Sequence, residues 1–219
     1  MRSVADIQNI LYINLENRED RRQLVNEELQ SLGWATNPTW FKALKTTNGA
    51  IGCTLSHIKC IEYARQMKWS HVLICEDDIK FTQPAAFTEN LNRFLASGIA
   101  WDVILIAGNN AGRYQDTSQG AVRVQACQTT TGYLVKNTYY STLIKNFTEG
   151  VTLLMRDPAN RTKYAIDRYW FSLQAKDRWY LIYPLTVTQQ ADYSDIENRH
   201  TNYDQMMLTL DKSGWFKRK

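Results

Sequence analysis

A short apolar run that ends in three acidic residues constrains the fold of this chain more than any other stretch. Val72–Cys75 contains four apolar residues without alternation, and Glu76, Asp77 and Asp78 follow directly. An unbroken apolar run of this length is typical of a strand buried on both faces, as in a parallel sheet. In open α/β sheets, ligands bind outside the carboxyl ends of the strands. We therefore expect a ligand site at this acidic strand end.

The acidic residues indicate which kind of ligand such a site would bind. Adjacent carboxylates repel one another, but they can share a hard divalent cation, which can hold the phosphates of a nucleotide. Because strand side chains alternate, Glu76 and Asp78 are expected on one side and Asp77 on the other. The alternative is an acidic cluster in a solvated turn or at a helix start. Three acidic letters alone do not separate these interpretations.

Strands and helices are predicted to alternate along the chain. Predicted strands cover residues 10–15, 40–45, 72–75, 101–107, 122–126, 134–135 and 179–183. The first predicted helix ends near residue 32. Three more cover 55–67, 87–95 and 138–147, and another begins at 166. Gly150 is expected to end the fourth helix, and residues 108–120 and 189–204 are expected to be polar loops. The alternation predicts an α/β fold with a mostly parallel sheet.

Length and composition predict a single packed domain. Hydrophobic residues make up 44% and charged residues 22% of the 219 residues. We expect two halves, at about 1–110 and about 111–204, followed by a basic tail at 205–219. A net charge of +4 is small for this length and does not predict nucleic-acid binding. The end of this tail, Lys212–Lys219, is expected to be solvated, with weak contact to a membrane surface as the alternative.

The cysteines and the start of the chain bear on its compartment. Cys75 lies in a predicted buried strand and is expected to be a free core thiol, which favours reducing surroundings. Residues 1–10 are polar and lack the apolar region of a signal peptide. No apolar run approaches the length that spans a membrane. We therefore expect a cytoplasmic protein.

Three arginines follow the first predicted strand. Arg18, Arg21 and Arg22 lie where the first loop of a βα unit faces its ligand, so any of them is placed to meet a diphosphate. The alternative is that they are solvated charges paired with Glu19 and Asp20. The sequence does not separate the two roles.

A glycine-containing segment precedes the second predicted helix. Residues 46–52 are expected to form a loop in which Gly49 and Gly52 let the backbone approach a ligand closely. Ser56 and His57 are then expected in the first turn of the helix, next to whatever that loop binds. A structural role is the alternative for His57.

Several segments, taken together and in order, resemble glycosyltransferase family 25. These segments are Tyr12–Arg22, Gly49–His57, Glu76–Asp78, Thr131–Tyr133 and Ser194–Ile196. The resemblance extends from about residue 10 to about residue 200. That family includes the lipooligosaccharide galactosyltransferases of bacteria and the procollagen galactosyltransferases.

The resemblance implies a GT-A type fold, a UDP-sugar donor, Mn²⁺ or Mg²⁺, and transfer with inversion. It places Asn14, Leu15 and Arg18 at the nucleotide and diphosphate. The other residues expected at the donor are Gly49, Gly52, Ser56, His57, Thr131, Gly132 and Tyr133. The expected metal ligands are Asp78 first and Glu76 second, with Asp77 as a substitute and His200 as a further ligand. The motif here is Glu-Asp-Asp and not Asp-x-Asp, which leaves open which two acids bind the metal.

An inverting transfer needs a base for the acceptor hydroxyl. Asp167 is the candidate, because it is expected at a helix start beside Tyr169 and Trp170, whose rings could stack on an acceptor. The alternative is a helix-end carboxylate that only supports the fold. The donor sugar, galactose or glucose, stays open, as does the acceptor: lipooligosaccharide, hydroxylysine or viral glycan.

Two other functions compete with sugar transfer. One is a non-catalytic module that keeps the fold and binds a glycan or a nucleotide. The other is a metal-dependent phosphoesterase that uses the same acids, which we expect less.

Overall fold

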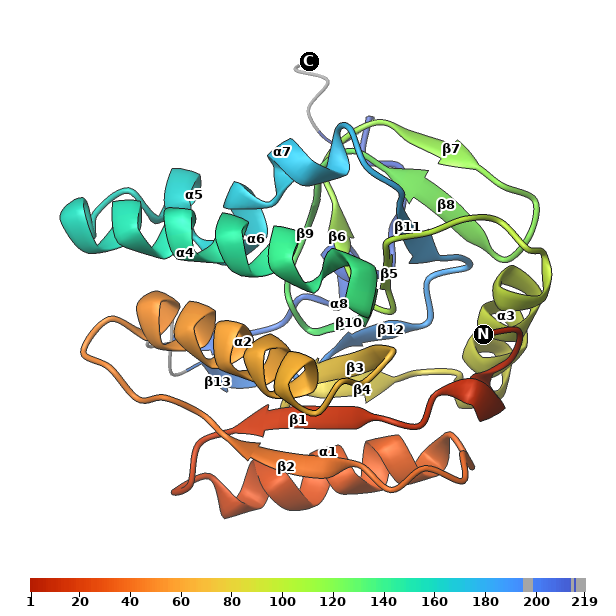
Figure 1. Cartoon of the computed structure of the whole chain (residues 1–219), viewed down its shortest axis with the longest axis horizontal. Coiled ribbons are helices and arrows are strands. Elements are labelled where there is room, and N and C mark those ends of the chain that lie inside the picture. The colour runs from red at the N-terminus through yellow and green to blue at the C-terminus, as the bar shows by residue number, and fades with distance from the viewer. Residues whose placement is uncertain (195–198, 214, 216–219) are drawn as a thin grey trace.

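The computed structural model describes residues 1–194, 199–213 and 215. It shows a mixed α/β fold in which helices cover both faces of a large central sheet (Figure 1). The strands are β1 Ile10–Asn14, β2 Thr39–Lys42, β3 His71–Glu76, β4 Ile79–Phe81, β5 Val103–Leu105, β6 Asn109–Asn110, β7 Tyr114–Asp116, β8 Ala121–Val124, β9 Cys127–Gln128, β10 Gly132–Lys136, β11 Trp179–Ile182, β12 Val187–Gln189, β13 Asp192–Ser194 and β14 Arg199–Thr201.

The helices follow the predicted alternation with several differences in extent. They are α1 Glu19–Ser31, α2 Gly49–Gln66, α3 Pro84–Ala96, α4 Tyr140–Arg156, α5 Arg161–Tyr164, α6 Ile166–Tyr169, α7 Phe171–Gln174 and α8 Asp204–Met207, with short 3-10 turns η1 Val4–Asp6 and η2 Asn137–Tyr139.

The central sheet has eight strands in the order β2-β1-β3-β10-β5-β11-β8-β7. β1 runs parallel to β2 and to β3, and β5 runs parallel to β11. β10 is inserted antiparallel between β3 and β5, and β8 is antiparallel to both of its neighbours. All strands of this sheet except β10 and β8 therefore point the same way. The predicted α/β class with a mostly parallel sheet is confirmed.

Two hydrophobic clusters, one on each face, hold the sheet in place. On one face, Ile61 of α2 packs with Leu143 and Phe147 of α4 over the sheet. On the other face, Val25 of α1 and Phe87 of α3 belong to the second cluster (Figure 1). β3 lies between the two clusters, which is why the run Val72–Cys75 has no polar residue.

The predicted glycine loop at residues 46–52 is wrong, because α2 begins at Gly49. Asn48 caps the helix, its side chain accepting a hydrogen bond from the Ala50 amide at 3.1 Å. A Cβ at Gly52 would lie 2.5 Å from the Leu44 carbonyl oxygen. Gly52 therefore lets the helix approach the backbone that leads into it, and not a ligand.

The helix predicted at 138–147 is also longer than expected. Gly150 lies inside α4 and does not end it. A Cβ at this position would lie 2.9 Å from the ring of Tyr169, so the missing side chain makes room for α6. A glycine that ends a helix and one that permits helix packing are not distinguishable from the sequence.

The two polar loops predicted at 108–120 and 189–204 contain short strands. β6 and β7 lie in the first, and the β13–β14 hairpin lies in the second. Beyond them, Met207 of α8 is buried and Lys212 Nζ donates to the Asn110 carbonyl oxygen at 2.8 Å. The chain therefore packs on the body of the protein as far as Lys212, where the predicted solvated end begins. Residues 217–219 lie outside the described part.

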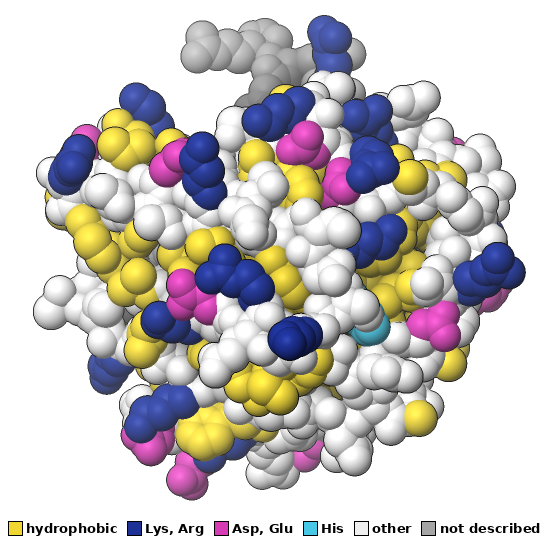
Figure 2. All heavy atoms as spheres, in the orientation of Figure 1, with side chains coloured by type: hydrophobic (Ala, Val, Ile, Leu, Met, Phe, Trp, Pro, Cys, Tyr) yellow, Lys and Arg dark blue, Asp and Glu magenta, His cyan; other side chains and the backbone are white. Residues whose placement is uncertain are grey.

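Charges are interspersed over the molecular surface. Figure 2 shows Lys and Arg side chains mixed with acidic and apolar side chains on the face it presents. In the part of the chain that the structure describes, no helix combines the length and the apolar character needed to cross a membrane.

Candidate active site

The acidic segment lies where β3 ends and the chain turns into β4. The strand stops at Glu76, and Asp77 and Asp78 form the turn that precedes Ile79. Glu76 contacts His57 of α2 and Asp77 contacts Arg21 of α1, so these two carboxylates face opposite sides of the sheet. Strand alternation does not carry through to Asp78, because that residue is already in the turn.

The Glu76 carboxylate accepts three short contacts from its surroundings. Its Oε1 accepts a hydrogen bond from Thr130 Oγ1 at 2.8 Å, and lies 3.4 Å from Cys53 Sγ and 3.3 Å from His57 Nε2. Burial alone would raise the pKa of Glu76, but the hydrogen bonds from His57 and Thr130 outweigh it and lower that pKa. On its other side, the His57 ring meets the Tyr133 hydroxyl, with 3.0 Å between Nδ1 and Oη. His57 thus contacts the acidic segment, from a fully buried position.

Asp77 is held by one amide and one guanidinium. Asn14 Nδ2 donates to Asp77 Oδ2 at 2.8 Å and to the Arg18 carbonyl oxygen at 2.9 Å. Arg21 Nη1 lies 3.2 Å from Asp77 Oδ1. Burial and the nearby Glu76 raise the pKa of Asp77 more than Arg21 and Asn14 lower it. Asn14, expected at the nucleotide, is buried and holds the first loop against the acidic turn.

Asp78 is the least compensated of the three acids. Gln189 Nε2 lies 3.4 Å from Asp78 Oδ1, and the Asp78 carbonyl oxygen accepts from the Gln190 amide at 2.6 Å. Burial, together with the carboxylates of Glu76 and Asp77, raises the pKa of Asp78 well above its ordinary value. A carboxylate in these surroundings is stabilised by any cation that joins it.

The three arginines after β1 have separate roles. Arg18 Nη2 lies 2.9 Å from Asp20 Oδ2 and 3.1 Å from Asp192 Oδ2. Arg21 Nη2 lies 3.2 Å from the same Asp192 oxygen and donates to the Tyr193 carbonyl oxygen at 2.6 Å. These contacts fasten the β13–β14 hairpin beside the acidic turn. Arg22 stacks over the Trp40 ring, 4.0 Å from its centroid.

Asp192 was not recognised as a site residue from the sequence. It lies 171 residues beyond Arg21, in a segment that looked like a polar loop. The hairpin that carries it also carries His200, whose ring packs edge-on against Tyr193 with 5.6 Å between centroids. The resemblance at Ser194–Ile196 falls largely on residues 195–198, which lie outside the described ones.

Asp167 lies at the start of α6, as predicted. Its Oδ2 accepts a hydrogen bond from the Thr129 amide at 3.2 Å. Burial, with a contribution from Glu76, raises the pKa of Asp167 above its ordinary value, against the opposing effects of Thr129 and Arg168. Thr129, which binds Asp167, is followed by Thr130, whose hydroxyl donates to Glu76, so Asp167 lies near the acidic segment.

The Thr131–Gly132–Tyr133 segment supports the site from β10 and from within the core. The Thr131 carbonyl oxygen accepts from the Glu76 amide at 2.9 Å. Gly132 has no room for a Cβ, which would lie 2.6 Å from Ile106, and Tyr133 is fully buried. The Thr131 hydroxyl is buried and has no hydrogen-bond partner among the described residues.

Two further residues singled out from the sequence are fully buried. Ser56 Oγ donates to the Gly52 carbonyl oxygen at 2.7 Å and accepts from the Leu44 amide at 2.8 Å, so it holds α2 to the preceding segment. Trp170 is fully buried, and its Nε1 donates to the Cys127 carbonyl oxygen at 2.9 Å. Trp170 therefore cannot stack on an acceptor in this conformation.

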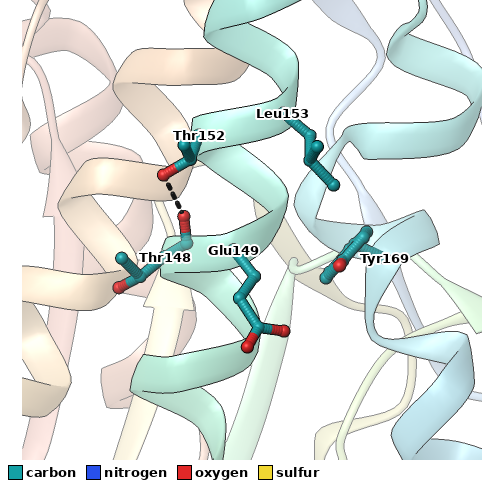
Figure 3. A pocket seen from close by; sticks show the side chains of 5 residues that line it. All are labelled: Thr148, Glu149, Thr152, Leu153 and Tyr169. Atoms are coloured by element: carbon teal, nitrogen blue, oxygen red, sulfur yellow. Dashed lines mark hydrogen bonds between the residues drawn. The ribbon is translucent and has the colours of Figure 1, made fainter.

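Two surface depressions are lined by residues of β1, β2, α4 and α6 or by residues next to these elements. The larger, about 440 Å³, adjoins the carboxyl ends of β1 and β2. It is lined by Leu15, Glu16, Asn17, Lys42, Ala43, Leu44 and Lys45. The smaller, about 290 Å³, lies between α4 and α6, where Tyr169 and Leu153 line it together with Thr148, Glu149 and Thr152 (Figure 3). Leu15, one of the residues expected at the donor, lines the larger depression.

Comparisons with solved structures give only weak similarity. A glycosyltransferase involved in the glycosylation of the major capsid of PBCV-1 has a TM-score of 0.47 and 15% identity, over 81% of each chain. A Drosophila beta-1,4-galactosyltransferase 7 mutant in complex with manganese, UDP-Gal and xylobiose has a TM-score of 0.44 and 7% identity, over 97% of this chain and 80% of that one. No curated protein sequence matches the chain.

Comparison with sequence families is more specific. The model of glycosyltransferase family 25, described as LPS biosynthesis protein, matches residues 39–169. That range contains α2, the acidic segment, β10 and Asp167, so it includes most of the geometry described above. The chain therefore belongs to glycosyltransferase family 25.

Proposed function

We propose that the protein transfers a hexose, galactose or glucose, from a UDP-sugar to a glycan or to a hydroxylysine-type acceptor, with inversion and with a divalent metal ion. Family membership supports glycosyl transfer as the reaction class. The observation that carries the finer proposal is the poorly compensated Asp78 carboxylate, half-buried beside Glu76 and Asp77 in the turn after β3.

The donor set fits Mn²⁺ or Mg²⁺. Both ions prefer carboxylate oxygens, and a cation would offset the repulsion that raises the pKa of Asp78. Asp78 and Glu76 would hold the ion. Asp77 is the alternative to Glu76, and each of the two already has partners within the protein. His200 lies on the adjoining hairpin as a further candidate. A bound dication would stabilise the negative charge that develops on the diphosphate.

The nucleotide would occupy the depression beside β1 and β2. Leu15 lines it, and Lys42 and Lys45 bring positive charge to its edge. Arg18, bonded to Asp20 and Asp192, would exchange part of these contacts for donor phosphate oxygens. Asn14 would position Arg18 through its hydrogen bond to the Arg18 carbonyl oxygen.

Asp167 would accept the proton of the acceptor hydroxyl. A general base works best when its pKa approaches the working pH, and burial raises the pKa of Asp167 in that direction. The Thr129 amide orients its carboxylate.

A non-catalytic module that binds a glycan or a nucleotide is the second candidate. It is favoured by the internal contacts of Glu76 and Asp77, which are already bonded to residues of the protein itself. A protein that kept the fold without the reaction would need no further partner for these carboxylates.

Release of UDP separates the two functions. UDP-galactose and UDP-glucose are incubated with and without Mn²⁺, using native protein, Asp78→Ala and, as an exposed control, Asp116→Ala. Sugar transfer predicts Mn²⁺-dependent release by native protein and by the control, with loss in Asp78→Ala. Equal release in all settings contradicts metal-dependent transfer. Glycan binding in a calorimeter without turnover of any nucleotide sugar supports the module.

A further inference from the structure

One side-chain cluster beside the acidic turn has a chemistry that sugar transfer does not use. Cys53 and His57 lie four residues apart on α2, so both side chains project from the same face of the helix. Glu76 reaches them from the end of β3. Among the described residues, the ligand atoms of these three side chains all lie within 4.8 Å of one another. The group therefore offers a thiol, an imidazole and a carboxylate at one point.

We propose that Cys53, His57 and Glu76 form a binding site for a zinc-type divalent cation. Typical zinc bond lengths and tetrahedral angles place nitrogen and oxygen ligands about 3.4 Å apart, and sulfur and oxygen ligands about 3.6 Å apart. Here His57 Nε2 lies 3.3 Å from Glu76 Oε1, and Cys53 Sγ lies 3.4 Å from it. Glu76 Oε1 therefore has near-tetrahedral spacing to each of the other two ligand atoms, and the ligand atoms of Cys53 and His57 lie within 4.8 Å of each other. A fourth position is left for water.

The surrounding residues orient these ligands as the outer shell of a metal site does. A metal-bound imidazole usually donates its second N–H to a protein acceptor. Tyr133 Oη, 3.0 Å from His57 Nδ1, supplies that acceptor, and the two rings stack with 5.6 Å between centroids. With the proton on Nδ1, the metal would take the place of the Nε2 hydrogen bond to Glu76, and the Nε2 lone pair would face the metal between Cys53 and Glu76. Thr130 Oγ1 donates to the Glu76 carboxylate and limits its rotation.

The proposed zinc site differs in chemistry from the site proposed for Mn²⁺ or Mg²⁺. Thiolate and imidazole ligands select zinc-like ions, whereas Mn²⁺ and Mg²⁺ prefer oxygen ligands. On binding, the Cys53 thiol releases its proton to solvent and its sulfur bonds to the metal. Glu76 is common to both sites, so zinc bound here would withdraw it from Asp78. The zinc site itself does not depend on sugar transfer.

The test is a titration with Co²⁺, which adopts zinc-like coordination and reports a thiolate ligand by a charge-transfer band. Native protein is compared with Cys53→Ala and with Cys60→Ala, a buried cysteine on the same helix that lies outside the cluster. We expect one equivalent of Co²⁺ to give the band in native protein and in Cys60→Ala, and Zn²⁺ to displace it. Cys53→Ala should lose the band and bind Zn²⁺ at least about 100-fold more weakly, measured against a chromophoric chelator.

A native protein without the band, or a band that persists in Cys53→Ala, overturns the proposal. Thermal melts followed by circular dichroism establish that each variant is folded, and Cys53→Ser replaces Cys53→Ala if the latter is not. Asp78→Ala should keep the band while losing Mn²⁺-dependent release of UDP. Because the band needs no substrate, failure of sugar transfer and failure of the zinc site are observed separately.

Discussion

Arg21 and Asp77 form a buried ion pair in which Nη1 lies 3.2 Å from Oδ1, and their side chains are only 10% and 14% exposed. The same guanidinium reaches Asp192 at 3.2 Å and the Tyr193 carbonyl oxygen at 2.6 Å. One side chain from α1 therefore joins the acidic turn after β3 to a hairpin near the end of the chain. Arg21 therefore has a structural role in the site, and the sequence left open whether it would meet a diphosphate or pair with a carboxylate.

Replacing Arg21 by Ala should destabilise the protein strongly. It leaves the buried Asp77 carboxylate with Asn14 as its hydrogen-bond partner and without a counter-charge, a change that typically costs about 3–5 kcal/mol. The pair with Asp192 should add little, because that carboxylate is 39% exposed. Urea unfolding of Arg21→Ala measures the loss, with the exposed Arg113→Ala as control, for which a change within about 0.5 kcal/mol is expected. Equal losses in the two variants would contradict a buried ion pair.

Asp167→Asn should lower kcat for hexose transfer by about 10²–10⁴-fold and leave KM for the donor nearly unchanged. A base is active when deprotonated, and burial raises the pKa of Asp167 above that of an ordinary aspartate. Activity of the native enzyme should therefore rise with pH through this raised pKa, and the variant should lack that limb. A pH series of kcat provides the measurement. Asp157→Asn, at an exposed position after α4, should keep the native profile.

Leu44→Trp should weaken donor binding without harming the fold. Leu44 lines the depression beside β1 and β2, and its side chain is exposed, so an indole there fills space that the nucleotide is proposed to occupy. KM for the UDP-sugar should rise roughly tenfold, equivalent to about 1.4 kcal/mol, with kcat unchanged. Leu24→Trp on α1 is the matched control, since Leu24 is 41% exposed against 42% for Leu44. A normal KM in Leu44→Trp would place the nucleotide elsewhere.

Asp102 should make stability depend on pH. Burial opposes its ionisation, but hydrogen bonds from the Arg178 amide at 3.1 Å and from Nε at 2.9 Å prevail and lower the pKa of Asp102. A lowered native pKa stabilises the fold above the ordinary aspartate pKa, and this contribution is lost as pH falls through the native value. The gap in unfolding free energy between native protein and Asp102→Asn should therefore be widest near neutral pH and shrink in acid. Asp116→Asn, at an exposed position, is the matched control.

The sequence predicted the elements whose signal is local. Val72–Cys75 is a buried strand because both faces of the sheet are covered, and that condition leaves an apolar run that can be recognised directly. The acidic residues after it and the helix start at Asp167 were also visible in the sequence. The alternation of strands and helices gave the α/β class, but not the antiparallel insertion of β10, because short apolar runs do not reveal strand direction.

Other parts of the site depend on contacts that no local pattern encodes. Gly52 is needed because it approaches the Leu44 backbone, and Gly150 because it approaches the Tyr169 ring. Both partners lie outside the helix that carries the glycine. His57 was expected at a helix start and is instead in the third turn of α2, facing Glu76. The pairing of Arg21 with Asp192 joins residues far apart in the chain, so only the folded arrangement identifies it.

The position of β10 has a consequence for how the protein can fold. This strand, at residues 132–136, separates β3 from β5, so the first 110 residues alone cannot complete their own sheet. The Thr131 carbonyl that binds the Glu76 amide arrives with the same strand. Long-range strand pairing of this kind is slow, because the chain loses the entropy of closing a large loop before any stabilising contact forms. The acidic turn should therefore acquire its final shape late in folding, after most of the chain has been synthesised.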